Sequence, residues 1–437
     1  MGNSLISIDP GSGKIWATSP TNQVEDVDKY IESSPTALNS FRYTDARQPI
    51  NILLKWHELI TNAREDIAKV VVYETGKPMA EAAKPSVSPI GVNVALVPWN
   101  FPVSMIIRKV AAALAAGCTM VVKPSPESPF SVMALADLAL RAGLPAGALN
   151  IISTDNTNTP SVSERLCKHP LVRKVTFTGS TNVGIIIAKH CAEGLKKVTM
   201  ELGGNCPFLI FDDGDLNQAV AALMILKWRT AGQACTHANR VYVQSGVYDK
   251  FAQKMLEATQ KLKVGHGAET GTAMGPLTTG RQVEKVEKHV SDAISKGGNV
   301  LCGGKRPENL KNGYFLEPTI ISGMTPDMLT TQEEIFGPLL GLYRFETEEE
   351  AVELANNTSM GLASYFYTKD VSRTWRLLES LEAGMIGMNT GNASCAESPF
   401  GGIMSSGYGK EAGKDVAIEE YLISKTGTLT VDGAPTP

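Results

Sequence analysis

The stretch VRKVTFTGSTNVGIIIAKHCAEGLKKVTMELGGNCPFLIF, residues 172–211, decides the fold class of this chain. Its apolar and β-branched runs at residues 172–178, 197–201 and 208–211 predict three buried strands, and residues 182–191 predict a helix between the first two. Strands that alternate with helices of this length form right-handed crossovers and a mostly parallel sheet. Because ligands of such sheets bind beyond the carboxyl ends of the strands, functional residues are expected there.

The same alternation extends on both sides of this stretch. Before it, strands are predicted at residues 91–97, 118–122 and 149–153, with a helix at residues 129–141. After Cys235 a second series of strands and helices begins, and a chain of 437 residues exceeds what one hydrophobic core usually supports. The pattern therefore predicts an α/β protein with at least two domains.

The two ends of the chain add a helix and a strand. Apolar residues recur at helical spacing from residue 50 to residue 73. Residues 422–431 form an alternating, Thr-containing run that predicts a strand, and no neighbouring segment offers it an evident partner. A terminal strand of this kind usually pairs with a distant element, and a second subunit is one candidate.

The composition excludes several classes of function. Charged residues make up 20% of the chain and the formal net charge is -4, so no surface for nucleic acid or anionic membrane is expected. The seven cysteines never form a CxxC pair and the six histidines lack metal-ligand spacing, so we expect reduced thiols and no metal site. Neither a signal peptide nor a membrane span is expected, which makes the cytoplasm the default location.

Two residues offer the chemistry of covalent catalysis, although neither is decisive alone. Cys235 ends the motif GQAC and could act as a nucleophile if a base and oxyanion donors lie beside it. Most free cysteines, however, are simply small buried hydrophobic residues. Glu201 follows a predicted strand and precedes a Gly-Gly turn, which suits a partly buried base with a shifted pKa. An isolated glutamate is more often a solvated or ion-paired charge.

Three further motifs give weaker signals. Two prolines bracket Asn100 in PWNFP and stiffen its backbone, so that its amide could donate to an oxyanion. Gly179 and Ser180 in TFTGS lie at a strand-to-helix junction, where backbone N–H groups can hold a pyrophosphate. Glu334 in QEEIFGP precedes a rigid turn and could accept hydrogen bonds from ribose hydroxyls. Each motif alone is explained at least as well by a structural role, and for Asn100 a rigid turn is the better explanation.

Taken in order, the motifs PWNFP, KPSPESP, FTGST, ELGGN, GQAC, EEIFGP and SPFGG resemble the signature set of the aldehyde dehydrogenase superfamily. The resemblance extends from about residue 8 to residue 422. The segments RTAGQACTHANR and SGYGKEAG are most similar to the succinate-semialdehyde dehydrogenase branch. The implied fold is a Rossmann-type parallel-sheet cofactor domain, an α/β catalytic domain and a reduced oligomerisation arm.

The resemblance also implies a division into domains. Residues 1–234 together with residues 401–421 would bind NAD or NADP. Residues 235–400 would form the catalytic domain, and residues 422–437 would supply the terminal strand of the oligomerisation arm.

The resemblance assigns a role to each candidate residue. Cys235 would attack the aldehyde, Asn100 and the Cys235 N–H would hold the oxyanion, and Glu201 would activate the water that releases a carboxylic acid. Lys123 and Glu334 would hold the two riboses of the cofactor. The full set of implied cofactor-binding residues is Trp99, Asn100, Lys123, Pro124, Ser125, Pro126, Gly179, Ser180, Leu202, Glu334 and Phe336.

Two features of the sequence bear on the choice of cofactor and substrate. Proteins of this family often carry a carboxylate two residues after the Lys-Pro pair, where Pro126 stands here and Glu127 is displaced by one residue. The resemblance therefore implies that NADP is slightly favoured over NAD, unless Glu127 reaches the ribose. Arg108 and Arg229 match the arginines with which the succinate-semialdehyde branch binds a distal carboxylate, and Ser394 would be the third contact.

The sequence departs from the family after Ala83. The family normally has a long helix and a β-hairpin strand there, whereas only residues 84–88 remain before Pro89. That block helps to wall the substrate tunnel and forms part of the oligomerisation arm. We therefore expect exposed apolar surface, a weakened homo-oligomer and impaired activity.

Three alternatives to the oxidation of a small acidic aldehyde are considered. The chain could oxidise an aromatic or aliphatic aldehyde instead. It could also be a nucleotide-binding pseudoenzyme, which the missing block favours and the retained Cys235, Glu201 and Asn100 oppose. A CoA-acylating reaction is disfavoured, because Glu201 supplies a hydrolytic base.

Overall fold

The structure is a computed structural model that describes residues 4–8, 15–20, 84–310 and 313–427. The chain divides into two units, one comprising Met1–Ser86 with Thr426–Pro437 and the other Val87–Lys425. The predicted helix at residues 50–73 lies outside the described residues. No helix among the residues that the structure describes is long and apolar enough to cross a membrane.

Two short antiparallel pairs are found near the ends of the chain. Strands β1 (Ser4–Ile8) and β2 (Ile15–Pro20) pair with each other. Strand β3 (Lys84–Pro89) forms a two-stranded sheet with β19 (Leu422–Gly427). The predicted terminal strand therefore exists, but its partner lies within the chain, in the shortened segment. The two strands are far apart in the sequence, so no local pattern could reveal their pairing.

The first large sheet of the unit Val87–Lys425 has six strands in the order β18-β8-β7-β4-β5-β6. All neighbours are parallel except β18, which pairs antiparallel with β8. The strand bounds are β4 (Val92–Leu96), β5 (Thr119–Lys123), β6 (Leu149–Ile151), β7 (Val172–Thr178), β8 (Lys197–Glu201) and β18 (Gly407–Tyr408). The strand order reverses between β4 and β7, and in doubly wound sheets ligands bind at such a reversal.

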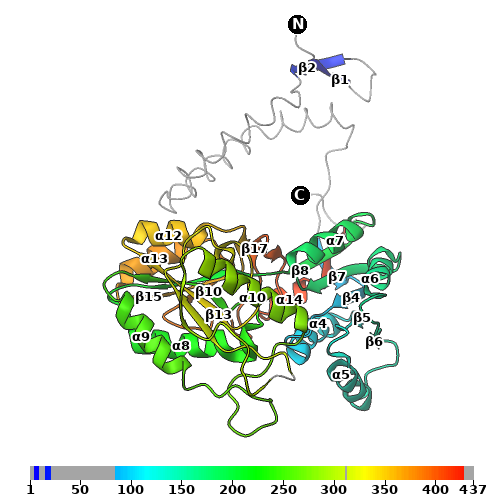
Figure 1. Ribbon diagram of the computed structural model, residues 1–437. Helices are drawn as coiled ribbons and strands as arrows, with labels where there is room; N and C mark the ends of the chain where they lie inside the picture. Colours follow the sequence, from blue (N-terminus) through cyan, green and yellow to red (C-terminus); the bar gives the residue numbers. More distant parts are fainter. Residues whose placement is uncertain (1–3, 9–14, 21–83, 311–312, 428–437) are drawn as a thin grey trace. The chain divides into compact units, whose positions relative to one another are not determined.

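Helices cover both faces of this sheet, because β4 is apolar on both faces. The helices are α4 (Pro102–Ala115), α5 (Pro129–Arg141), α6 (Thr159–Lys168) and α7 (Thr181–Ala192), and Figure 1 labels all four. Val94 and Leu96 belong to a hydrophobic cluster with residues of α6 and α7, whereas Ala95 and Val97 belong to a second cluster with residues of α4 and α5.

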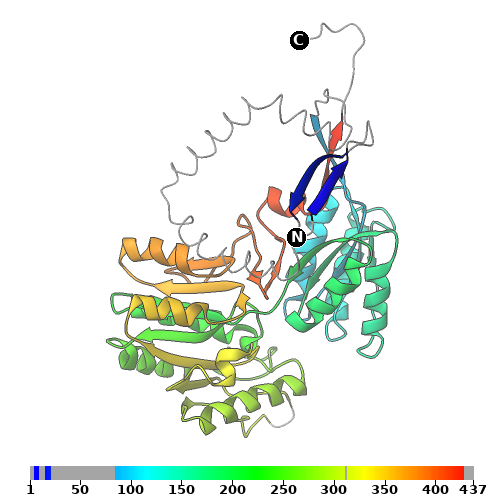
Figure 2. The same cartoon turned by 90° about the horizontal axis from the view of Figure 1, so that it is seen from above.

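The second large sheet has seven strands in the order β11-β12-β13-β10-β9-β15-β16, and every pair except β11 with β12 is parallel. Figure 2 shows it in green to orange beside the cyan and teal six-stranded sheet. Its strands are β9 (Cys206–Ile210), β10 (Ala238–Gln244), β11 (Asn299–Cys302), β12 (Thr319–Ser322), β13 (Leu339–Phe345), β15 (Ala363–Tyr367) and β16 (Met385–Met388).

The helices of this sheet and the remaining short elements complete the unit. The longer helices are α8 (Leu216–Trp228), α9 (Tyr248–Thr259), α10 (Gly280–Ser295), α12 (Glu348–Asn356) and α13 (Val371–Ser380). The short elements are the 3-10 turn η1 (Arg229–Gly232), helices α11 (Leu329–Gln332) and α14 (Asp415–Glu419), and the antiparallel pair β14 (Met360–Gly361) and β17 (Ile403–Met404).

The chain passes from the six-stranded sheet to the seven-stranded sheet soon after β8. β9 lies inside the seven-stranded sheet, between β10 and β15, and every residue of this strand is buried. The two sheets are therefore joined between Glu201 and Cys206. Cys235 itself lies on the loop that leads from α8 to β10, and β10 is a strand of the seven-stranded sheet.

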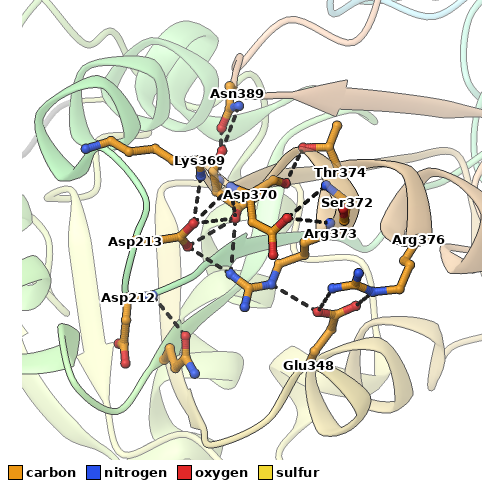
Figure 3. A network of polar contacts seen from close by, with 12 residues as sticks. Asp212, Asp213, Glu348, Lys369, Asp370, Ser372, Arg373, Thr374, Arg376 and Asn389 are labelled. Atoms are coloured by element: carbon orange, nitrogen blue, oxygen red, sulfur yellow. Dashed lines mark hydrogen bonds and ion pairs between the residues drawn. The ribbon is translucent and has the colours of Figure 1, made fainter.

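A network of polar contacts closes the seven-stranded sheet beyond the carboxyl ends of β9 and β15 (Figure 3). The Asp213 carboxylate accepts hydrogen bonds from four donors, namely Thr368 Oγ1, the backbone N–H groups of Lys369 and Asp370, and Arg373 Nη1. Arg373 and Arg376 also form ion pairs with Glu348. This end of the sheet is therefore filled by structural contacts.

Candidate active site

A pocket of about 310 Å³ opens where the carboxyl ends of β4, β7 and β8 meet the loop of Cys235 and the start of α10. It lies at the strand reversal between β4 and β7, where a doubly wound sheet binds its ligand. Eight of the predicted site residues line it, namely Trp99, Asn100, Gly179, Ser180, Leu202, Cys235, Glu334 and Phe336. The structure thus brings together motifs that are spread over more than half of the chain.

Glycines allow three of these motifs to touch through their backbones. A Cβ atom on Gly204 of ELGGN would lie 2.3 Å from the Cys235 carbonyl oxygen. A Cβ atom on Gly232 of GQAC would lie 2.1 Å from the Gly337 carbonyl oxygen of EIFGP. Gly232 also has φ +74°, the left-handed region that favours glycine. The loop of Cys235 is therefore held between two turns that come from distant parts of the sequence.

The Cys235 thiol is partly exposed and lines the pocket, but its surroundings favour the protonated form. Burial raises the pKa of the thiol far above its usual range, and the negative charge of Glu334 raises it further. The charge of Arg108 acts in the opposite direction without compensating for burial. A nucleophilic role for Cys235 therefore requires a base that removes the proton.

Glu201 supplies a carboxylate that no other described group satisfies. The residue is 2% exposed, and neither carboxylate oxygen has a hydrogen-bond partner among the described residues. Burial raises the pKa of Glu201 well above its usual value, and the nearby charge of Glu411 adds to the effect. Glu201 does not line the 310 Å³ pocket. A buried carboxyl with a raised pKa is nonetheless the kind of group that serves as a general base near neutral pH.

A buried ion pair lies beside Glu201. Lys109 Nζ bonds to the Glu411 carboxylate, and it also donates to Thr176 Oγ1 at 3.0 Å and to Thr178 Oγ1 at 2.7 Å. Sequence reasoning missed the pair, because its partners are 302 residues apart and neither belongs to a motif with evident chemistry.

The Asn100 amide connects PWNFP to the loop of Cys235. Asn100 Nδ2 donates to the Gln233 carbonyl oxygen at 3.0 Å, and Asn100 Oδ1 is buried without a partner among the described residues. An amide nitrogen carries two hydrogens, so one N–H group stays free for an oxyanion at Cys235. The bond to Gln233 fixes the orientation of the amide.

The pocket has the groups that a dinucleotide requires. The start of α7 at Ser180 carries no side-chain cap, so its backbone N–H groups can face a pyrophosphate. Trp99 and Phe336 meet edge to face with ring centroids 5.6 Å apart, and both line the pocket. Glu334 Oε1 accepts from the Gly204 N–H at 3.1 Å, which leaves its second oxygen for a ribose hydroxyl. The residues present therefore fit NAD or NADP.

The four residues from Lys123 to Pro126 do not line this pocket, whereas Glu127 does. The Glu127 carboxylate accepts from Ser125 Oγ and from Asn156 Nδ2, the latter at 3.4 Å. Burial opposes ionisation of Glu127, but these hydrogen bonds hold its pKa below the usual value. An ionised carboxylate thus lies in the pocket one residue after the position at which the family carries one.

Two of the three predicted substrate residues share a second pocket of about 640 Å³. Arg108 and Ser394 both line it. The Arg108 guanidinium lies 4.0 Å from the centroid of the Phe400 ring, and Arg108 Nη1 is buried without a partner among the described residues. Arg229 lines neither pocket, because its exposed side chain lies over the Phe101 ring at 5.3 Å.

Sequence reasoning also missed the side of the cofactor pocket that α10 forms. Thr279, Arg281, Gln282 and Lys285 line it. Gln282 Nε2 donates to the Phe336 carbonyl oxygen at 2.7 Å, and Lys285 Nζ donates to the Glu334 carbonyl oxygen. The only local signal was the Thr279 N-cap of an amphipathic helix, which is common and carries no chemistry. Among the described residues, no group of His, Cys, Asp and Glu could hold a metal ion.

Comparisons with known proteins agree with this arrangement. The sequence profile of the aldehyde dehydrogenase family matches residues 2–88 and 85–426, two segments that meet where the deletion was predicted. Glutarate-semialdehyde dehydrogenase of Pseudomonas putida is 43% identical over 456 aligned positions, covering 96% of this chain and 93% of the relative. The NADP-dependent succinate-semialdehyde dehydrogenase of Escherichia coli is 42% identical, with the same coverage. The 456 aligned positions exceed the 437 residues of this chain, so both relatives have residues without a counterpart here.

The fold of solved structures agrees as well. The crystal structure of succinate-semialdehyde dehydrogenase from Burkholderia pseudomallei matches with a TM-score of 0.77 and 40% identity, over 98% of this chain and 95% of that one. The predicted α/β fold with parallel-sheet cores is thereby confirmed. A profile match over both segments, with relatives above 40% identity along almost their whole length, shows that the chain belongs to the aldehyde dehydrogenase family.

Proposed function

We propose that the chain oxidises a short aldehyde with a distal carboxylate, such as succinate or glutarate semialdehyde, to the dicarboxylic acid with NAD or NADP. The observation that carries this proposal is the position of Cys235, which lines the pocket at the strand reversal together with the groups that fit a dinucleotide. The relatives named above act on semialdehydes of this class.

In the proposed reaction Glu201 first prepares the nucleophile. It accepts the proton of the Cys235 thiol, directly or through one water, because its raised pKa makes it a suitable proton acceptor near neutral pH. The thiolate attacks the aldehyde carbon and forms a thiohemiacetal. The free Asn100 N–H and the Cys235 backbone N–H stabilise the negative charge on its oxygen.

A bound dinucleotide would supply the hydride acceptor, and loss of hydride from the thiohemiacetal leaves a thioester on Cys235. Glu201 releases to solvent the proton that it took from Cys235, and its carboxylate then takes a proton from the water that attacks the thioester carbonyl. The C–S bond breaks, the carboxylic acid leaves, and the Cys235 thiolate regains a proton from Glu201. The packing of Gly204 against the Cys235 carbonyl keeps the nucleophile in place through both halves of the reaction.

Arg108 and Ser394 would hold the distal carboxylate. Arg108 Nη1 is buried without a partner among the described residues, and a buried guanidinium donor gains most from a charged acceptor. Ser394 lines the same pocket and offers a hydroxyl donor. Arg229 is exposed and lines neither pocket, so the proposal assigns it no direct contact with the carboxylate.

The proposal also places the enzyme in the cytoplasm and leaves any homo-oligomer weakened by the shortened segment at residues 84–88. The scattered cysteines, which never form a CxxC pair, support the first part, and the missing block that the family uses in its oligomerisation arm supports the second.

The test is NADH and NADPH formation by the purified chain with succinate semialdehyde and with glutarate semialdehyde, beside a Cys235→Ala variant. Turnover that disappears in the variant supports the proposal, and butanal, which lacks the carboxylate, should react with a much higher KM. A folded protein that binds the dinucleotide but oxidises none of these aldehydes would instead support a nucleotide-binding pseudoenzyme.

A further inference from the structure

The pocket that contains Arg108 is larger than a short semialdehyde requires. Its volume of about 640 Å³ lies within the range of roughly 300 to 1,000 Å³ that holds drug-sized ligands. A four-carbon or five-carbon semialdehyde would leave most of this space empty. The volume therefore points to a longer substrate.

Part of the pocket wall is built from small, apolar side chains. Ala111, Ala112 and Ala115 form one side on α4, and Gly413 and Ala417 lie among the lining residues contributed by the segment around α14. The side chains of this part offer no hydrogen bonds and suit a chain of methylene groups. Each methylene group that leaves water should improve binding by about fourfold.

The pocket also has a second cation in addition to Arg108. Arg108 lies on the side of the reaction centre, because its guanidinium packs on the Phe400 ring at 4.0 Å and a Cβ atom on the next residue, Gly401, would lie 2.8 Å from Glu201 Oε1. Lys414 lines the same pocket, is exposed to solvent, and forms no ion pair within the part of the chain that the structure describes. Arg108 thus offers an inner site for a carboxylate and Lys414 an outer one, and the alanines of α4 line the same pocket.

The pocket is open along α4. Val103 and Ile107, which also line it, are 45% and 49% exposed. An open pocket with an apolar rim can accept a ligand longer than a four-carbon or five-carbon semialdehyde.

We propose that this enzyme is adapted to ω-oxo carboxylates of medium chain length, with the aldehyde at Cys235, the methylene chain along Ala111 and Ala115, and the carboxylate at Lys414. The inference rests on the proposed function and names its substrate class. Short semialdehydes reach Arg108 only and leave the apolar wall uncovered.

The experiment compares kcat/KM for succinate, adipate and suberate semialdehydes and for octanal, which has the length of suberate semialdehyde without its carboxylate. The expected result is a rise of at least about tenfold from succinate to suberate semialdehyde, against the roughly 250-fold that four fully buried methylene groups would give. Octanal should fall well below suberate semialdehyde.

Variants separate the apolar wall from the outer cation. Ala111→Leu narrows the pocket at an exposed helix position and should lower the ratio of kcat/KM for suberate to that for succinate semialdehyde by about tenfold. Ala134→Leu, the same change on the exposed face of α5, is the control and should keep the ratio. Lys414→Met should lower kcat/KM for suberate semialdehyde but not for octanal, and Lys414→Arg should restore it.

The outcomes distinguish this inference from the function on which it rests. Efficient turnover of succinate semialdehyde with kcat/KM falling steadily along the series overturns the inference and leaves the proposed function in place. Equal rates for octanal and suberate semialdehyde, or no effect of Lys414→Met, overturn the role of the outer cation. If none of the aldehydes is oxidised, both proposals are lost.

Discussion

Lys109 and Glu411 form an ion pair in which the two side chains are 0% and 4% exposed. The two charges of this pair change the pKa of Glu201 in opposite directions. The negative charge of Glu411 adds to burial in raising the pKa of Glu201, whereas the positive charge of Lys109 lowers it. Lys109 and Glu411 are therefore positioning residues that set the pH range in which Glu201 is available as a base.

Replacing Glu411 should move this pH range. Glu411→Gln removes the neighbouring negative charge, so the pKa of Glu201 falls and the acidic limb of the kcat profile shifts to lower pH. Gln keeps an oxygen that can accept from Lys109, which limits the loss of roughly 3–5 kcal/mol expected when one partner of a buried pair is removed. Lys109→Met should shift the limb in the opposite direction. Profiles that coincide with the wild type in folded variants would show that the pair does not act through Glu201.

Removing the carboxylate of Glu201 should separate the two halves of the reaction. In Glu201→Gln the thioester cannot be hydrolysed efficiently, so steady-state turnover should fall by about 10² to 10⁴-fold. Because the slower first half still reaches the thioester, pre-steady-state measurement should reveal a burst of NAD(P)H approaching one equivalent per Cys235. Cys235→Ala should show neither burst nor turnover. A variant with normal steady-state turnover would assign the base to another residue.

The contact between Gly232 and Gly337 predicts a strong effect of a single methyl group. In Gly232→Ala the new Cβ atom would lie 2.1 Å from the Gly337 carbonyl oxygen, and the residue would keep a φ angle of +74° that alanine disfavours. The loop must shift, so kcat should fall by about tenfold or more while the thermal midpoint also falls. Gly275→Ala is the matched control, because a Cβ atom there has no neighbour within 4 Å. Equal activity of both variants would contradict the packing described above.

The carboxylate of Glu127 should bias the choice of dinucleotide. It lines the cofactor pocket in ionised form, where it can accept from a ribose hydroxyl but repels a 2′-phosphate. Glu127→Ala should therefore raise the ratio of kcat/KM for NADP to that for NAD, by about tenfold. Dissociation constants for the two dinucleotides, measured without aldehyde, provide the check. Asn156→Ala, which removes one donor to Glu127 but keeps its charge, should change the ratio much less.

The contacts of Asp213 predict a dependence of stability on pH. Burial opposes its ionisation, but hydrogen bonds from Thr368 and Lys369 and the charge of Arg373 hold the pKa of Asp213 below its usual value. A carboxyl with a lowered pKa stabilises the folded state above its unfolded pKa, and this contribution is lost as pH falls through the folded pKa. Asp213→Asn should thus have a lower denaturation midpoint than the wild type near pH 7, and the difference should shrink towards pH 3. A difference that stays constant would exclude this linkage.

The bounds of helices and strands with a clear apolar pattern in the sequence were predicted closely. β7, β8 and α5 begin and end at the residues expected from the sequence. β7 and β8 are apolar or β-branched over most of their length, and α5 starts at Pro129, which suits the first turn of a helix. The motif residues that follow such strands were brought together correctly, because parallel strands place their carboxyl ends on one edge.

Other elements gave no local signal of this strength. α4 was not predicted, because its apolar end continues through the turn at Gly117 into β5 and disguises the boundary between them. α6 is mostly polar and was not predicted either. The passage of the chain into the seven-stranded sheet gave no local signal either. The membership of β9 in that sheet depends on pairings with β10 and β15 that no local pattern encodes.

The packing of the Cys235 loop between Gly204 and Gly337 has a practical consequence. The Cys235 thiol reaches its position only when segments from three distant parts of the chain have assembled. The reactivity of the thiol therefore depends on whether the surrounding structure is intact. In a Cys302→Ser, Cys395→Ser background, which removes the other thiols that are not buried, the rate of alkylation of Cys235 would measure structural integrity. A single stoichiometric titration with an alkylating reagent would then count the molecules in a preparation that are correctly assembled.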